Sequence, residues 1–244
     1  MLLVPLYIYP TNSSWMPIYN AIELRPTLNF TVIVNPSSGP GENPLPSDDY
    51  YTAVQKLNSY ANVKTVGYVR TGYATRNITE VIDDVLTYAG WSANSSSLGM
   101  SGIFFDEAVH QYDADAVTYM ETIDQVAKNA TGLLGDRRVI HNPGTIPDSR
   151  YNNSYVDITV VFEDNYTAWQ NKSAEVEALS EHRHLNSIMI NSVPWMSDSD
   201  LKMFVNDLAA KGEHIFITGN QKSFYESFAS DWFNFVDVTK STNQ

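Results

Sequence analysis

The sequence contains no cysteine, which excludes disulfide bonds and thiolate chemistry. Basic residues are also scarce, because 15 Lys and Arg stand against 28 Asp and Glu and give a formal net charge of -13. Nucleic-acid phosphates require basic patches, so we expect no nucleic acid as a partner. The acidic balance favours a neutral or cationic partner instead.

Several motifs that carry known chemistry are absent as well. No Gly-rich dinucleotide fingerprint follows the first apolar segment, and no Gly-x-Ser-x-Gly elbow supports a serine triad. Glu107-x-x-His110 has the spacing of two metal ligands on a helix, but there is no second such motif. We therefore expect neither a metal nor a cofactor.

The sequence also indicates where the protein resides. No segment has the apolar length needed to span a membrane. The absence of cysteine weakly favours the cytosol, but eight Asn-x-Ser/Thr sequons favour a secreted, glycosylated chain. We expect an extracellular or cell-surface monomer, whose targeting or anchoring segment is absent from this sequence. The sequons begin at Asn12, Asn29, Asn77, Asn94, Asn129, Asn152, Asn165 and Asn171.

Short apolar runs alternate with amphipathic segments along all 244 residues. The runs predict strands at 2–9, 30–35, 63–70, 102–105, 138–141, 158–162, 187–191 and 214–218. The helical periodicity predicts helices near 15–22, 48–60, 77–89, 117–130, 173–183, 198–211 and 224–235. This alternation indicates an α/β protein with a single (β/α)8 TIM barrel over residues 1–244. A doubly wound open sheet is the alternative.

Two of the predicted strands end in acidic residues. Asp106 and Glu107 close the run Gly-Ile-Phe-Phe, and Glu163 follows the run that ends at Phe162. Carboxylates at the carboxyl end of barrel strands suit glycoside hydrolysis, which needs a proton donor and a nucleophile or base. Burial against phenylalanine, and a second carboxylate nearby, would raise the pKa of one of them. Alternatively, Asp106 and Glu107 only cap the next helix or stay solvated in a loop.

The other strand ends supply hydrogen-bonding and aromatic side chains. Polar and aromatic side chains arranged around the barrel mouth suit a sugar, which offers hydroxyls to polar groups and an apolar face to aromatic rings. The predicted substrate contacts are Tyr7, Asn35, Arg70, His141, Asn142, Trp195 and Asn220.

Five motifs together resemble a known family. They are Val-Pro-Leu-Tyr-Ile-Tyr-Pro at 4–10, Val-Ile-Val-Asn-Pro-Ser-Ser-Gly-Pro-Gly at 32–41, Gly-Tyr-Val-Arg-Thr-Gly-Tyr at 67–73, Gly-Ile-Phe-Phe-Asp-Glu at 102–107 and His-Asn-Pro-Gly at 141–144. The sequence resembles the spherulin-4 family, glycoside hydrolase family 135, and within it the fungal members that cut galactosaminogalactan.

This resemblance implies a (β/α)8 fold and endo-acting hydrolysis of α-1,4-linked N-acetylgalactosamine in a polymer that also holds galactosamine and galactose. It implies catalytic roles for Asp106, Glu107 and Glu163. One hypothesis makes Glu107 or Glu163 the general acid/base, while Asp106 supports or forms the intermediate. In another, Asp106 orients the N-acetyl group of the substrate as an internal nucleophile, and fully deacetylated substrate is then not cut.

Two other classes of function stay open. A catalytically silent carbohydrate-binding or spore-coat protein could use the same barrel, because fold does not determine activity. A calcium-stabilised surface protein would use Asp113 and Asp115.

Overall fold

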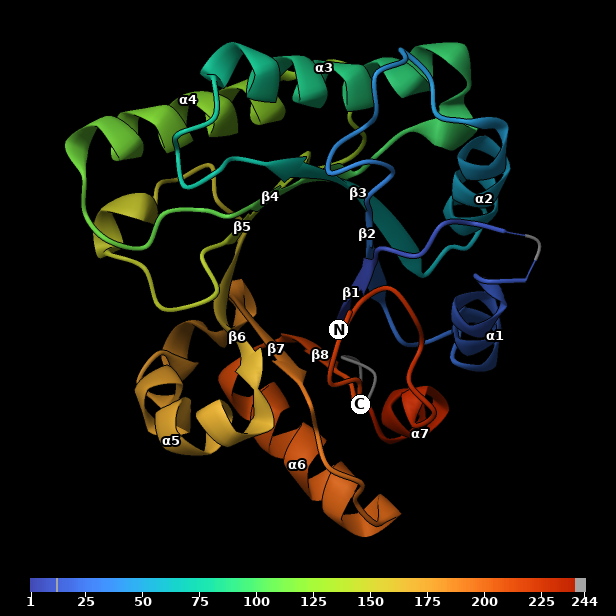
Figure 1. Cartoon of the computed structure of the whole chain (residues 1–244), viewed down its shortest axis with the longest axis vertical. Helices are drawn as coiled ribbons and strands as arrows, with labels where there is room; N and C mark the ends of the chain where they lie inside the picture. Colours follow the sequence, from blue (N-terminus) through green and yellow to red (C-terminus); the bar gives the residue numbers. More distant parts are fainter. Residues whose placement is uncertain (12, 240–244) are drawn as a thin grey trace.

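A computed structural model describes residues 1–11 and 13–239. Its eight parallel strands pair in sequence order and close into a barrel, which confirms the predicted TIM barrel and excludes the open sheet. Figure 1 shows the strands as a central ring with the helices outside it. The strands are β1 (Leu2–Leu6), β2 (Phe30–Val34), β3 (Val63–Arg70), β4 (Gly102–Asp106), β5 (Arg138–Asn142), β6 (Ile158–Asn165), β7 (Asn186–Asn191) and β8 (His214–Ile217).

Helices cover the outside of this ring. The α-helices are α1 (Met16–Leu24), α2 (Asp48–Asn58), α3 (Ile78–Asn94), α4 (Ala114–Asn129), α5 (Tyr166–Glu177), α6 (Asp198–Lys211) and α7 (Trp232–Val238). Short 3-10 turns lie at η1 (Ser96–Leu98), η2 (Ser149–Tyr151) and η3 (Ser180–Leu185). Within the described residues, the connection from β5 to β6 contains η2 and no α-helix. No helix in residues 1–11 and 13–239 combines the length and apolar character that a membrane crossing requires.

The strands are apolar because both of their faces are buried. Every residue of β1 and β2 is buried, since one face fills the barrel and the other meets the helices. The helices contribute their apolar stripes, as Val81, Val85 and Tyr88 of α3 show. The register of β6 against β7 shifts between Val160 and Phe162, where a bulge adds one residue. This bulge matters for the site described below.

Some predicted boundaries differ from the structure. α5 begins after Asn165, whose side chain accepts a hydrogen bond from the backbone N–H of Ala168, so the helix starts well before residue 173. The last helix begins at Trp232 rather than near residue 224, because 219–231 forms an irregular segment across the barrel mouth. The first strand ends at Leu6. The predicted sequon at Asn12 lies outside the described residues.

Candidate active site

Asp106 lies at the carboxyl end of β4, where parallel pairing sets Arg70 of β3 on one side and Asn142 of β5 on the other. Its carboxylate is half-buried and accepts two side-chain hydrogen bonds. Tyr68 donates its hydroxyl to Oδ2 at 2.6 Å, and Asn142 donates its Nδ2 to Oδ1 at 2.7 Å. The backbone N–H of Glu107 also binds this carboxylate. Asp106 is therefore held in one orientation by donors from β3, from β5 and from the residue that follows β4.

Glu163 reaches the same place from β6, and the bulge explains how. Phe162 points out of the barrel and packs on Trp169 of α5 with ring centroids 5.0 Å apart. The next residue, Glu163, therefore points inward. Its Oε1 accepts a hydrogen bond from the Tyr225 hydroxyl at 2.5 Å, and its Oε2 accepts one from Asn142 Nδ2 at 2.5 Å.

One amide nitrogen, Asn142 Nδ2, thus bridges the two carboxylates. The two accepting oxygens can be no further apart than the sum of 2.7 Å and 2.5 Å. The orientation of this amide is fixed, because its Oδ1 accepts the backbone N–H of Gly144 at 3.1 Å. Gly144 has φ 66, a left-handed conformation that glycine adopts freely, which gives a physical reason for the His-Asn-Pro-Gly sequence.

Burial raises the pKa of both carboxyls above their ordinary values. For Asp106, hydrogen bonds from Tyr68, from the N–H of Glu107 and from Asn142 oppose this effect by stabilising the anion. For Glu163, Tyr225 and Asn142 oppose it, and the nearby charge of Asp106 raises the pKa further. Two such close carboxyls favour a state that holds one proton. Asp106 accepts three of the hydrogen bonds that stabilise an anion and Glu163 accepts two, which favours the proton on Glu163.

Three tyrosines form the wall next to this pair. The ring of Tyr7 meets Tyr68 and Tyr225 edge-on, with centroids 5.4 Å and 5.5 Å away. Burial raises the pKa of all three phenols, so they stay neutral and can donate. The predicted residue Tyr7 therefore lies at the site. Tyr68 and Tyr225 were missed; alternation from Arg70 could have indicated Tyr68, but no pattern marks Tyr225.

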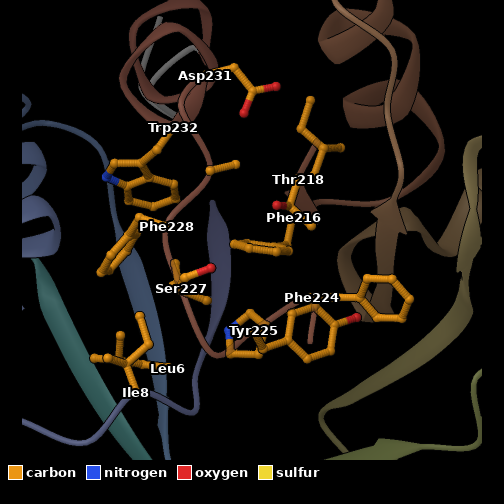
Figure 2. A pocket seen from close by; sticks show the side chains of 14 residues that line it. Leu6, Ile8, Phe216, Thr218, Phe224, Tyr225, Ser227, Phe228, Asp231 and Trp232 are labelled. Atoms are coloured by element: carbon orange, nitrogen blue, oxygen red, sulfur yellow. The ribbon is translucent and has the colours of Figure 1, made fainter. Parts of the chain in front are cut away.

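Tyr225 comes from the irregular segment 219–231. Figure 2 shows it beside Phe216 and Phe224, whose ring centroids lie 5.8 Å and 6.1 Å from its own. Apolar side chains from β1, β8 and this segment line the pocket beneath it. Asn220 was predicted to contact substrate, but its Nδ2 donates to the carbonyls of Phe224 and Ser227. In this structure Asn220 therefore holds the segment that presents Tyr225.

Glu107 lies at the rim but outside the bridged pair. Its carboxylate forms an ion pair with the Nε of Arg70 at 2.8 Å, and both side chains reach solvent. Its backbone is left-handed, with φ 53. The buried Thr71 hydroxyl contacts the carbonyl oxygens of Asp106 at 3.0 Å and of Glu107 at 2.7 Å. The chain turns at this point, so the adjacent carboxylates Asp106 and Glu107 point to different partners.

The remaining predicted contacts do not join the pair. The predicted substrate contact of His141 is not seen in the structure. Its ring is buried outside the barrel, with Nε2 2.7 Å from Asp124 Oδ1 of α4. Strand alternation explains this, since Asn142 takes the inward position. Asn35 accepts the N–H of Gly39 at 3.3 Å within its own loop. Trp195 follows β7 and is 86% exposed.

The structure offers no metal site in the described part of the chain. No three His, Cys, Asp or Glu side chains there are grouped to hold an ion. Asp113, one of the two residues in the calcium reading, caps α4 by accepting the backbone N–H of Ala116 at 2.8 Å.

Fold and site together define a TIM-barrel protein with an acidic pair at the carboxyl mouth of the barrel, where such proteins place their functional residues. Residues 1–239 match the family described as Spherulin4, spherulation-specific family 4. The chain belongs to this family.

Two relatives are similar to the chain. Spherulin-4 of Physarum polycephalum is 37% identical over 175 residues, which make up 69% of this chain and 48% of that protein. The chain thus spans about half the length of this curated relative. The crystal structure of Aspergillus clavatus Sph3 in complex with GalNAc is 43% identical, with a TM-score of 0.93 over 97% of this chain and 96% of that one.

Proposed function

We propose that this protein is an endo-acting glycoside hydrolase that cleaves α-1,4-linked N-acetylgalactosamine in a secreted galactosaminogalactan. The observation that carries the proposal is the amide-bridged pair Asp106 and Glu163 at the barrel mouth. The crystallised relative that binds GalNAc supports the choice of sugar. A binding protein would need neither two half-buried carboxyls in contact with one amide nor the desolvation that this arrangement costs.

The spacing of the pair supports a reaction that retains the anomeric configuration. Retaining enzymes place their carboxyls about 5 to 5.5 Å apart, whereas inverting enzymes leave about 6.5 to 9.5 Å for a water molecule. The oxygens of Asp106 and Glu163 that share Asn142 fall in the shorter class. At this spacing one of the two carboxylates attacks the sugar directly instead of activating a water molecule.

The burial and hydrogen bonds of the two acids support the following roles. Glu163 holds the proton and gives it to the departing glycosidic oxygen as the C1–O bond breaks. Asp106 is the anion, and its carboxylate oxygen forms a bond to C1 from the opposite face. In the second step Glu163 takes a proton from water, the water oxygen bonds to C1, and Asp106 leaves.

The stereochemistry of the substrate decides between Asp106 and the N-acetyl group as nucleophile. In an α-linked N-acetylgalactosamine the departing oxygen and the acetamido group are cis on neighbouring ring carbons. The acetamido oxygen therefore cannot attack C1 from the face opposite the departing oxygen. We assign the attack to Asp106, and we assign contacts with substrate hydroxyl or amino groups to Glu107 and Arg70.

Product release from an N-acetylgalactosamine polymer tests the proposal. Asp106→Asn and Glu163→Gln keep the shape of each side chain and remove its acidity, so each should lower kcat by at least about 10²-fold. Glu107→Gln should chiefly raise KM, because its carboxylate lies outside the bridged pair.

The matched control is Asp164→Asn, which changes an exposed carboxylate next to Glu163 in the same strand. It should retain activity. Circular dichroism should show the same fold in every variant. Absence of polymer cleavage by the wild type, combined with polymer binding, would replace the hydrolase with a carbohydrate-binding protein.

A further inference from the structure

Four large aromatic side chains on the loops after the strands are exposed: Tyr9, Tyr73, Tyr112 and Trp195. Two of them have partners. The Tyr9 hydroxyl donates to Asp49 Oδ2 at 2.8 Å, and the guanidinium of Arg150 lies 3.2 Å from the centre of the Tyr112 ring. Tyr73 is 59% exposed and Trp195 86% exposed, and neither side chain has a ring, ionic or hydrogen-bonding partner among the described residues. These two rings present an open apolar face at the mouth.

The backbone holds Tyr73 in an unfavourable conformation. Gly72, Tyr73 and Ala74 have φ 61, 54 and 60, so three residues in a row are left-handed. A left-handed residue with a side chain costs roughly 1 to 2 kcal/mol. The N–H of Tyr73 donates to the carbonyl of Glu107 at 2.7 Å, and the N–H of Arg76 to the carbonyl of Thr71 at 3.2 Å. Such over-determined strain clusters at functional sites, and here it joins Tyr73 directly to the catalytic rim.

Tyr73 and Trp195 lie on opposite sides of the barrel. Tyr73 follows β3 and Trp195 follows β7, and three strands separate β3 from β7 in either direction around the closed ring. Figure 1 shows β3 and β7 across the ring from each other. From the strand spacing and tilt of an eight-stranded barrel, opposite strands lie about 15 Å apart. Asp106 on β4 and Glu163 on β6 lie on the arc between them.

We propose that Tyr73 and Trp195 are two stacking platforms that bind pyranose rings on opposite sides of the bond that is cleaved. The ligand is a chain of linked sugars, because a single ring cannot span opposite strands. The chain crosses the mouth from the β3 side to the β7 side, and the acidic pair acts on its interior. This inference rests on the proposed function and deepens it, because two platforms that flank the pair give endo cleavage a structural cause. Among the predicted contacts it includes Trp195 and adds Tyr73.

Oligosaccharide binding and cleavage together test this proposal. Tyr73→Asn removes the ring and keeps a residue that tolerates the left-handed conformation, and Trp195→Ala removes the other ring. Each should weaken the binding of an N-acetylgalactosamine oligosaccharide, measured by calorimetry, about tenfold. Each should raise KM for the polymer similarly. Tyr73→Phe should restore binding.

The control is Phe233→Ala, which removes an aromatic ring that is 42% exposed on α7. It should bind like the wild type. Unchanged oligosaccharide binding in both Tyr73→Asn and Trp195→Ala, with the wild-type melting temperature, would overturn the platforms. Binding without cleavage in the wild type would instead overturn the proposed hydrolase, and loss of this binding in the two variants would still support the platforms.

Discussion

Asn142 sets the chemistry of the site by touching both acids at once. Its Nδ2 lies 2.7 Å from Asp106 and 2.5 Å from Glu163, and it is itself buried. A neutral donor between two carboxyls holds them close without neutralising either. Their mutual repulsion and their burial then favour one proton on the pair. Each acid accepts one tyrosine hydroxyl, Tyr68 on Asp106 and Tyr225 on Glu163. The asymmetry comes from the backbone N–H of Glu107, which binds only Asp106 of the two.

Replacing Tyr225 with phenylalanine tests the protonation of Glu163 through the pH dependence of the reaction. Burial raises the pKa of Glu163, and the hydrogen bond from Tyr225 lowers it, so Tyr225→Phe leaves the pKa higher still. Glu163 must be protonated to act as the acid, so the alkaline limb of kcat/KM should move to higher pH.

Tyr60→Phe is the control, because that hydroxyl donates to Glu23, at 2.6 Å, on the outside of the barrel. Its pH profile should match the wild type. A Tyr225→Phe profile whose alkaline limb stays in place or moves to lower pH would remove Glu163 as the acid.

At the scale of elements, a buried polar contact connects β5, the strand that carries Asn142, to its covering helix. Asp124 of α4 is fully buried, and its Oδ1 lies 2.7 Å from His141 Nε2. Its Oδ2 accepts a hydrogen bond from Asn153 Nδ2 at 2.8 Å. Asn153 belongs to the β5–β6 connection, which lacks an α-helix among its described residues. This contact therefore fixes β5, whose next residue is Asn142, from outside the barrel.

Asp124→Ala should lower the free energy of unfolding by about 2 to 5 kcal/mol, because it leaves the buried His141 and the half-buried Asn153 without their partner. Urea denaturation measures the change. The matched control is Asp136→Ala, which breaks an exposed 3.8 Å ion pair with Lys64 and should change stability by less than about 1 kcal/mol. Equal effects of the two substitutions would show that the buried contact is not structural.

The strands could be predicted from the sequence because a strand that is buried on both faces is a continuous apolar segment. Helix boundaries were less predictable, since α5 begins at the cap Asn165 and buries only Trp169 and Val176, too few apolar positions to mark its period. Strand alternation could have separated His141 from Asn142, because both cannot face inward. The bulge that turns Glu163 inward, and the irregular segment that carries Tyr225, depend on tertiary contacts and leave no local pattern.

At the scale of the whole molecule, closing the barrel assembles a site from distant residues. Tyr68 and Asp106 are 38 residues apart, and Glu163 and Tyr225 are 62 apart. The net charge of -13 suits a polymer that carries free amino groups, since it attracts cations at low salt. We propose on the same grounds, together with the sequons, that the protein acts outside the cell. Spherulin-4 of Physarum polycephalum is about twice as long as the segment that it shares with this chain.

Trapping the covalent intermediate tests the central claim most directly. An activated α-linked N-acetylgalactosaminyl fluoride needs no general acid to depart, but hydrolysis of the intermediate needs a base. Glu163→Gln should therefore form the glycosyl-enzyme and release it slowly. Intact-protein and peptide mass spectrometry should find one sugar residue on Asp106. The Asp106→Asn, Glu163→Gln double variant should carry none. Turnover of the fluoride with inverted product and no sugar on Asp106 would contradict the assigned roles.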